Sequence, residues 1–326
     1  MSHAPGSTET VIETRGLRRT FKSRRGAVEA VAGVDLRVEA GEIFGFLGPN
    51  GAGKTTTLRM LATLLPPTGG DATVAGVDLR RQSGVVRTRI GYVGQSGGTD
   101  PMVTGRSELI LQGRFYGLSA AEARQRAAEL IAKVELDDCA DRRTGTYSGG
   151  QRRRLDIALG MVHRPQVLFL DEPTTGLDPQ SRARMWDEVR LRREEGTTVF
   201  ITTHYLEEAD VLCDRLAIID HGQIVAEGTP DALKRQIAGD VVTVGVAANP
   251  EAAVATLRHQ PFVREAGSEE DGLLRLYVDR GETAMPQILR LLDGAGLELS
   301  TISLTRPSLD DVFLRQTGRS LRETAA

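Results

Sequence analysis

Short apolar runs alternate along this chain with segments whose apolar residues recur every three or four positions. From Val11 onward, this alternation is typical of an α/β unit built on a mostly parallel sheet. The apolar run at residues 43–47 predicts a buried strand, and the pattern at residues 55–65 predicts the helix that follows it. Further strands are expected at residues 167–170, 197–201 and 216–219, separated by a helical pattern at 180–195 and an acidic segment at 206–210.

The pattern changes to helix alone between residues 104 and 134. In this stretch the residues that share one helical face are Ala123, Ala127, Leu130, Ile131 and Val134. We interpret the stretch as a helical insertion, so that a helical subdomain occupies about residues 100–165 of the α/β unit.

A domain boundary is predicted near Gly239. Residues 240–326 contain no lysine and carry a net charge of −4, whereas the remainder of the chain carries +1. Strand-like and helix-like segments alternate in this last part, which predicts a small α+β domain. We therefore expect a polar tail at residues 1–10, a main domain at 11–239 and a second domain at 240–326.

Composition restricts the class of protein. With 326 residues, 40% hydrophobic residues and 26% charged residues, the chain is typical of a globular protein of about two domains, and no apolar run is long enough to span a bilayer. The start shows no secretory pattern, and Cys139 and Cys213 stand alone, so we expect an intracellular protein whose cysteines are packed as small apolar residues. A net charge of −3 and 4% aromatic residues argue against a nucleic-acid partner.

Residues 48–56, GPNGAGKTT, match the phosphate-binding loop pattern between a predicted strand and a predicted helix. Glycines allow backbone N–H groups to converge on phosphate oxygens, and the helix start adds the positive end of its dipole. Lys54 would lie between the β- and γ-phosphates, and Thr55 would offer its hydroxyl to Mg²⁺. The predicted nucleotide-binding residues of this loop are Gly48, Pro49, Asn50, Gly51, Ala52, Gly53, Lys54, Thr55 and Thr56.

Residues 167–172, VLFLDE, form an apolar run that ends in two carboxylates. A parallel strand delivers such residues to the carboxyl edge of the sheet, where ligands bind in folds of this kind. We therefore predict that Asp171 holds Mg²⁺ through water and that Glu172 is the general base that polarises the attacking water.

Residues 147–151, YSGGQ, precede a second helical pattern. Ser148 suits a helix N-cap, and Gly149 and Gly150 would present bare N–H groups to an anion. One γ-phosphate seldom needs two such sites in one chain, so a second subunit is implied. The basic run at residues 152–154 is interpreted as a solvated helix face with one arginine near the subunit interface. Acidic lipid or RNA is the alternative contact of this run. Trp186 is interpreted as a core anchor.

The SGGQ segment at residues 148–151, only 23 residues before Asp171, resembles the signature of ATP-binding cassette (ABC) ATPases. The other segments of that family follow in order: the loop at 48–55, Gln95 in YVGQ, the LDE strand end, Gly176-Leu177-Asp178 and His204. The resemblance covers about residues 11–238 and implies an α/β P-loop NTPase fold with a helical subdomain.

The resemblance also implies a head-to-tail homodimer with ATP between the subunits. In such a dimer Gln95 touches Mg²⁺ and the attacking water, and His204 bonds the γ-phosphate and orients Glu172, so that Glu172, His204 and Gln95 are the catalytic set. The metal set is Thr55, Gln95 and Asp171. Across the interface ATP would meet Ser148, Gly149, Gly150, Gln151 and Asp178, while Phe21 would stack on adenine.

Two functions of different classes remain at this point: the motor of a membrane exporter, and a soluble cassette that works on ribosomes or DNA. The single module and the separation of 94 positions from Lys54 to Ser148 favour the exporter. The segments GEIFGFLGPNGAGKTT, FLDEPTTGLDPQSR and RPSLDDVFL are similar to the daunorubicin-resistance ATP-binding family. That resemblance implies a drug-export ATPase at the cytoplasmic face of the membrane, a separate multi-pass permease and a C-terminal accessory domain. Export of a lipid, a polysaccharide or another natural product stays open.

Overall fold

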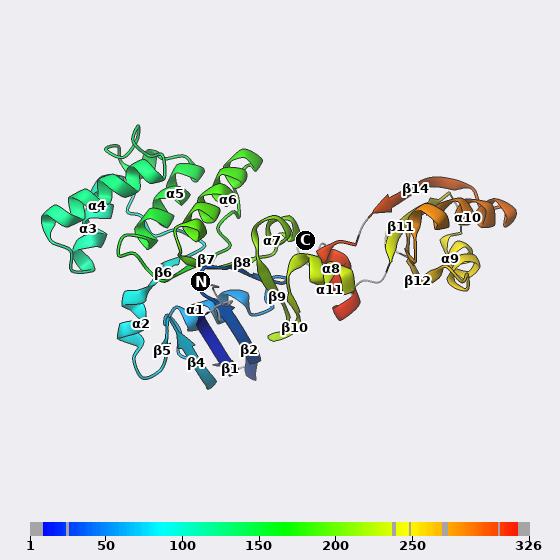
Figure 1. Ribbon diagram of the computed structural model, residues 1–326, viewed down its shortest axis with the longest axis horizontal. Coiled ribbons are helices and arrows are strands. Elements are labelled where there is room, and N and C mark those ends of the chain that lie inside the picture. The colour runs from blue at the N-terminus through cyan, green and yellow to red at the C-terminus, as the bar shows by residue number, and fades with distance from the viewer. Residues whose placement is uncertain are drawn as a thin grey trace, which may run out of the picture. The chain divides into compact units, whose positions relative to one another are not determined.

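The computed structural model describes residues 9–23, 26–236, 239–247, 249–268, 273–305 and 307–318, so most of the expected polar tail lies outside the described residues. The chain forms two compact units, which divide after Pro230 (Figure 1). Each unit has a hydrophobic core of its own and is described by itself.

A six-stranded sheet of order β10-β9-β3-β8-β7-β6 forms the centre of the first unit. Its strands are β3 (Ile43–Leu47), β6 (Ile90–Val93), β7 (Val167–Asp171), β8 (Thr198–Thr203), β9 (Arg215–Asp220) and β10 (Gln223–Gly228). All neighbouring pairs are parallel except β9 and β10. Every residue of β3, β7 and β8 is buried, as expected for parallel strands covered on both faces. The prediction of a parallel sheet is confirmed here.

A second sheet in this unit is antiparallel, contrary to the expectation of a mostly parallel arrangement from Val11 onward. It consists of β1 (Thr10–Ser23), β2 (Gly26–Glu39), β4 (Gly69–Val74) and β5 (Val77–Asp78), in the order β2-β1-β4-β5. In β2 only alternate residues toward its end are buried, among them Val34, Leu36 and Val38. Half of the residues of the hairpin formed by β1 and β2 are polar because they face away from the core. The apolar pattern of this segment in the sequence is therefore weak.

Four further helices of this unit are α1 (Lys54–Leu61), α2 (Ser83–Arg89), α6 (Pro179–Glu194) and α7 (Leu206–Leu212). Helix α1 ends at Leu61, four residues earlier than expected. The backbone leaves the helix there because Thr63 adopts a left-handed conformation, with φ of 61°.

The helical subdomain contains α3 (Gly105–Phe115), α4 (Ala120–Lys133), the 3₁₀ turn η1 (Thr144–Thr146) and α5 (Gly149–Gly160). The predicted apolar face of α4 is confirmed, because Ala123, Ala127, Leu130 and Ile131 are buried. Helices α3, α4 and α5 lie together in Figure 1, beyond the edge strand β6. The chain crosses from this edge to the helices directly after Val93, which places Gln95 at the junction.

The second unit is an α+β fold, as the sequence predicted. Its sheet has the order β12-β13-β11-β14, and every neighbouring pair is antiparallel. Its elements are β11 (Asp240–Val246), α9 (Pro250–Arg258), β12 (Val263–Ser268), β13 (Leu273–Val278), α10 (Gly281–Gly294) and β14 (Leu299–Thr305), with α8 (Pro230–Gln236) before them and α11 (Leu309–Thr317) after them. Strand β12 escaped prediction because only Val263 and Ala266 of its residues are buried.

Candidate functional site

The glycine-rich loop connects β3 to α1, as the sequence predicted. At Gly53 φ is 108°, and a Cβ there would lie 2.5 Å from the carbonyl oxygen of Ala30. At Gly48 a Cβ would lie 2.3 Å from the carbonyl oxygen of Ile219. Because no other residue fits either position, both glycines are required for the loop to close over α1.

Lys54 is the first residue of α1, and its side chain is buried inside the loop. The Lys54 Nζ donates hydrogen bonds to the carbonyl oxygens of Gly48 (2.7 Å) and Pro49 (3.1 Å) and lies 3.3 Å from Glu172 Oε1. Burial lowers the pKa of Lys54, and the charge of Glu172 opposes that shift. The ammonium group is therefore held at one place by acceptors on two sides.

Glu172 follows β7 directly and has φ of 46°, an uncommon backbone conformation for a residue other than glycine. Its Oε2 accepts a hydrogen bond from Gln95 Nε2 at 3.2 Å and lies 3.3 Å from His204 Nδ1. Burial raises the pKa of Glu172, but the nearby His204 side chain and the charge of Lys54 outweigh it, so the net shift is downward. Glu172 is thus ionised at neutral pH although it is buried.

Asp171, the last residue of β7, fits the place of a metal ligand. Its Oδ1 accepts hydrogen bonds from the hydroxyls of Thr55 (2.9 Å) and Thr202 (2.8 Å), whereas its buried Oδ2 has no hydrogen-bond partner among the described residues. Within the described part of the chain, no three His, Cys, Asp or Glu residues gather in a metal site. This oxygen donor set therefore suits Mg²⁺, which takes few protein ligands and keeps water and phosphate oxygens in its shell.

Lys54, Glu172, Gln95 and His204 line one cavity of about 520 Å³. It collects side chains from the loop, the segment after β6, the end of β7 and the end of β8, which are far apart in the sequence. Its lining residues are Ala30, Pro49, Asn50, Gly51, Gly53, Lys54, Thr55, Thr56, Gln95, Glu172, Thr175 and His204. All three predicted catalytic residues are thus brought together with the loop.

The residues expected on the opposite side of ATP are not among those lining this cavity. Ser148 caps α5 and forms a reciprocal capping box with Gln151. Asp178 caps α6, and its carboxylate accepts hydrogen bonds from the backbone N–H (2.9 Å) and hydroxyl (2.6 Å) of Ser181. Phe21, which is expected to stack on adenine, also lies outside the lining; it is 41% exposed, with the Arg19 guanidinium 4.7 Å from the centre of its ring. The remaining two, Gly149 and Gly150, begin α5.

Gly150 lies beside the start of α6, since a Cβ on it would be 3.1 Å from Ser181 Oγ. The signature segment and the Asp178 turn are therefore neighbours in space within one chain. Together they form a second group of polar residues, separate from the cavity.

Arg153 was missed by the sequence analysis, and the interpretation of residues 152–154 as a solvated face is wrong for it. Arg153 is buried and donates to the carbonyl oxygens of Gly94 (2.6 Å), Pro173 (2.8 Å) and Asp171 (3.2 Å). Those carbonyls adjoin Gln95 and Glu172, so one guanidinium joins the two segments. The helical spacing of residues 153, 157 and 160, which share a face, is the signal that could have revealed it.

Two threonines were also missed. Thr202 on β8 donates to Asp171 and accepts a hydrogen bond from the Glu172 N–H at 3.0 Å. Thr175 lines the cavity, and its hydroxyl lies 3.3 Å from Glu172 Oε2. No sequence pattern marked either residue, because threonine is common in strands and turns.

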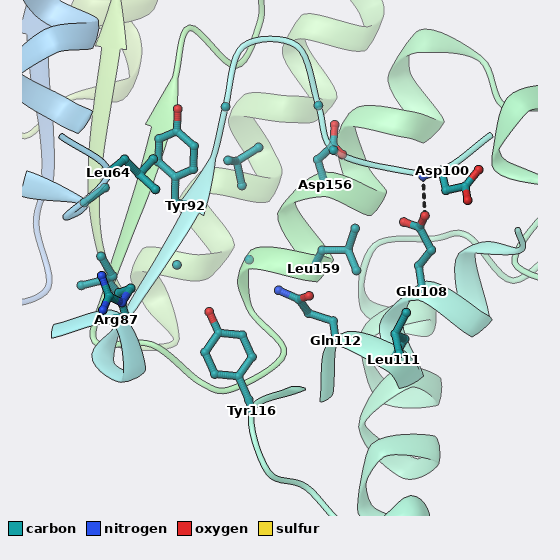
Figure 2. Close-up of a pocket in the computed structure, with 18 of the residues that line it drawn as sticks. Leu64, Arg87, Tyr92, Asp100, Glu108, Leu111, Gln112, Tyr116, Asp156 and Leu159 are labelled. Atoms are coloured by element: carbon teal, nitrogen blue, oxygen red, sulfur yellow. Dashed lines mark hydrogen bonds between the residues drawn. The ribbon is translucent and has the colours of Figure 1, made fainter. Parts of the chain in front are cut away.

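A second cavity of about 540 Å³ lies between the edge of the central sheet and the helical subdomain. Figure 2 shows Tyr92 and Tyr116 on one side of it and Glu108 and Leu111 on the other. The chain that follows Gln95 contributes Gly97, Gly98 and Asp100 to the lining. The two cavities are thus connected by one short segment that includes Gln95.

Comparisons with known proteins agree with this fold. Residues 31–175 match the family described as ABC transporter. A solved structure titled as the dimeric, post-hydrolysis state of the ATP-binding cassette MJ0796 bound to ADP and Pi superimposes with a TM-score of 0.62, at 26% identity over 67% of this chain and 98% of that one. The chain is therefore an ATP-binding cassette ATPase, and proteins with this fold bind ATP.

Within that class, residues 228–317 match the C-terminal domain of DrrA1-3-like ATP-binding proteins. The chain is 47% identical to the daunorubicin resistance ATP-binding protein DrrA2 of Streptomyces coeruleorubidus, over 94% of this chain and 96% of the relative. It is 46% identical to the daunorubicin/doxorubicin resistance ATP-binding protein DrrA of Streptomyces peucetius, over 96% of each. The chain belongs to this family of ABC transporter ATP-binding proteins. Among its described helices, none has the length and apolar character to cross a bilayer.

Replacing Arg153 with methionine should reduce both stability and turnover. The change leaves three carbonyl oxygens without their donor and Asp156, 3.9 Å away, without its buried partner. We expect a loss of about 3 kcal/mol in the free energy of unfolding, followed in urea by the fluorescence of Trp186, the single tryptophan of the sequence.

The matched control is Arg152→Met, which alters an exposed residue and should change stability by less than about 0.5 kcal/mol. Lysine at position 153 should restore little, since it cannot reach three acceptors as a planar fork does. Equal stability of the two methionine variants would contradict the assigned role.

Proposed function

We propose that this protein is the ATP-hydrolysing motor of an exporter that moves a drug or antibiotic through a separate multi-pass membrane permease. The observation that carries the ATPase is Glu172, a buried carboxylate between Lys54 and His204 at the mouth of the phosphate loop. The resistance functions named for relatives at 46–47% identity support the drug class.

In this proposal Glu172 accepts the proton of the attacking water at Oε2, where Gln95 and His204 converge. Its lowered pKa keeps it in the ionised form that a base requires. His204 fixes the direction of the carboxylate, and Lys54 with the loop N–H groups binds the phosphates. Bound Mg²⁺, held by Asp171, Thr55 and Gln95, would neutralise phosphate charge.

The second half of the site comes, in this proposal, from another copy of the chain. Ser148, Gly149, Gly150 and Gln151 begin a helix with N–H groups suited to a γ-phosphate, yet they lie outside the cavity of their own chain. A head-to-tail homodimer would set them and Asp178 against the partner's ATP. Phe21, exposed toward the end of β1, would stack on adenine.

The second cavity is the proposed docking place for the permease. Leu64 and Leu111, each more than half exposed, give it an apolar rim, and Glu108 and Asp156 add carboxylates. An occupant of this cavity touches residues 97–100 and thereby the segment that includes Gln95. Docking here would place the motor at the cytoplasmic face of the membrane, and no nucleic-acid partner is proposed.

Residues 11–239 are proposed as the nucleotide-binding domain, with about residues 100–165 as its helical subdomain, and residues 240–326 as an accessory domain that regulates or stabilises the dimer. A lipid, polysaccharide or other natural product is the alternative cargo. A soluble ATPase without a transport role is the second alternative, and the permease-dependent measurements below distinguish it.

Glu172→Gln should trap an ATP-bound dimer, because the amide keeps the shape of the side chain but cannot accept the proton. We expect kcat to fall about 10²- to 10³-fold, with a doubling of mass in ATP seen by light scattering. A monomer that retained full turnover would show that the site is assigned wrongly.

Lys54→Ala should act earlier, on nucleotide binding itself, and weaken ATP affinity at least about 10-fold through loss of a charge-assisted contact. Titration with a fluorescent ATP analogue measures it. Lys22→Ala, which removes an exposed lysine of β1, is the control and should leave affinity unchanged.

Leu111→Glu should uncouple the motor from its membrane partner. A further carboxylate beside Asp100, Glu108 and Asp156 opposes docking of an apolar segment, while the ATPase cavity is untouched. We expect ATPase activity of the isolated protein within about twofold of wild type, with loss of co-purification with the permease and of efflux. Leu191→Glu, at a partly exposed leucine of α6, is the control; equal loss in both variants would exclude the cavity as the docking place.

A chain that ends at Pro230 lacks the second unit entirely. If that unit stabilises the dimer, truncation in the Glu172→Gln background should raise the protein concentration required for dimerisation in ATP at least about 10-fold. Unchanged dimerisation and export would dismiss the accessory role.

A further inference from the structure

Helices α6 and α7 begin directly after two of the site segments. Helix α6 is capped by Asp178, and α7 starts two residues after His204. Arg182 and Trp186 are four positions apart on α6, so they share one face of that helix. The contacts of this face reach the chain around His204.

The first contact joins Trp186 to Glu208, the third residue of α7. The indole Nε1 donates a hydrogen bond to Glu208 Oε1 at 3.1 Å, and the Glu208 side chain is fully buried. Burial raises the pKa of Glu208, and the hydroxyls of Thr203 and Thr174 and the indole oppose that shift only in part. These neighbours come from the strand before His204 and from the turn after Glu172, so Glu208 lies where three segments meet.

The second contact joins Arg182 to Tyr205. The guanidinium lies 4.7 Å from the centre of the Tyr205 ring, which itself lies 4.1 Å from the centre of the His204 ring. The Tyr205 N–H is fixed by the hydroxyl of Thr203 at 2.9 Å. A guanidinium, a phenol ring and an imidazole therefore lie in contact one after another from α6 to the cavity, with the two rings tilted by 41°.

We propose that Glu208 and Tyr205 are positioning residues of the ATPase reaction, which tie α6 to His204 and so hold His204 against Glu172. This inference rests on the proposed function. It gives His204, whose Nδ1 lies 3.3 Å from Glu172, two supports outside the cavity. Because Asp178 caps the same helix, a shift of α6 at the partner's ATP also moves His204 in its own site.

The buried carboxyl group of Glu208 lowers the stability of the fold, and a residue with a purely structural role would avoid this cost. A buried carboxyl group is less favourable than an apolar side chain of similar volume, unless its hydrogen bonds are of use. Glu208→Leu should therefore fold, and it removes the acceptor of the Trp186 N–H. Glu208→Gln retains an oxygen that accepts the same hydrogen bond.

The test is steady-state ATP hydrolysis, with kcat and KM determined separately. We expect Glu208→Leu to lower kcat about 10- to 30-fold with KM for ATP within about twofold, because a small displacement of a positioned group acts on the transition state. Glu208→Gln should recover kcat to within about threefold of wild type. Trp186→Phe should lower kcat, and combining it with Glu208→Leu should add nothing, since the bond they share is already absent.

Tyr205 provides an independent measurement if Glu208→Leu does not fold. Tyr205→Phe keeps the ring between Arg182 and His204 and should retain kcat, whereas Tyr205→Leu should lower kcat without raising KM. Val189→Ala, at another buried position of α6, is the control for a loss of Tm alone.

The proposal is overturned if Glu208→Leu lowers kcat no more than a control of equal Tm, if the Gln variant is as impaired as the Leu variant, or if only KM changes. The proposed ATPase function still stands after any of these outcomes, provided that the wild type hydrolyses ATP and that Glu172→Gln forms the ATP-bound dimer. If neither occurs, the proposed function fails, and the positioning role fails with it.

Discussion

The charged state of one buried carboxylate is the constraint on which the site depends. Glu172 is ionised inside the protein because Lys54 and His204 lie within 3.3 Å of its oxygens. Glu172 and His204 directly follow the adjacent parallel strands β7 and β8, and Lys54 begins α1 after the loop that leaves β3; in these strands Asp171 pairs with Thr202 and Leu47 with Thr203. A shift of one strand by a single residue would reverse its side chains and separate the charges. The strand register therefore fixes the chemistry.

The parts of the site that could be predicted are those whose residues lie close together in the sequence. The spacing of Gly48, Lys54 and Thr55 is local, and so is the strand that ends in Asp171 and Glu172. The polar β1–β2 hairpin was not predicted, because half of its residues face away from the core. Arg153 was misinterpreted for a related reason: its acceptors are carbonyls of Gly94, Asp171 and Pro173, and only its helical spacing with residues 157 and 160 indicated that it is buried.

The polar groups of the cassette divide into two sets, and each set is stabilised in its own way. Around the cavity, charged side chains contact one another. Lys54 also donates hydrogen bonds to carbonyl oxygens of its own loop, so nucleotide binding would have to rearrange these contacts. At the start of α5 and α6, Ser148 and Asp178 instead satisfy the helix ends. The second set is thus held by hydrogen bonds within its own chain, an arrangement that favours little reorganisation when an anion binds.

The left-handed backbone at Glu172 places opposing demands on that position. A conformation with φ of 46° costs a residue with a Cβ of order 1 kcal/mol, and asparagine, aspartate or glycine would bear it more easily. Yet each of these is too short or lacks the carboxylate that meets His204. Substitutions that relieve the backbone strain at Glu172 therefore shorten or remove the catalytic base. A gain in folding free energy and a loss of catalysis are thus linked at this residue. Selection for stability alone would reduce the enzyme's activity through this position.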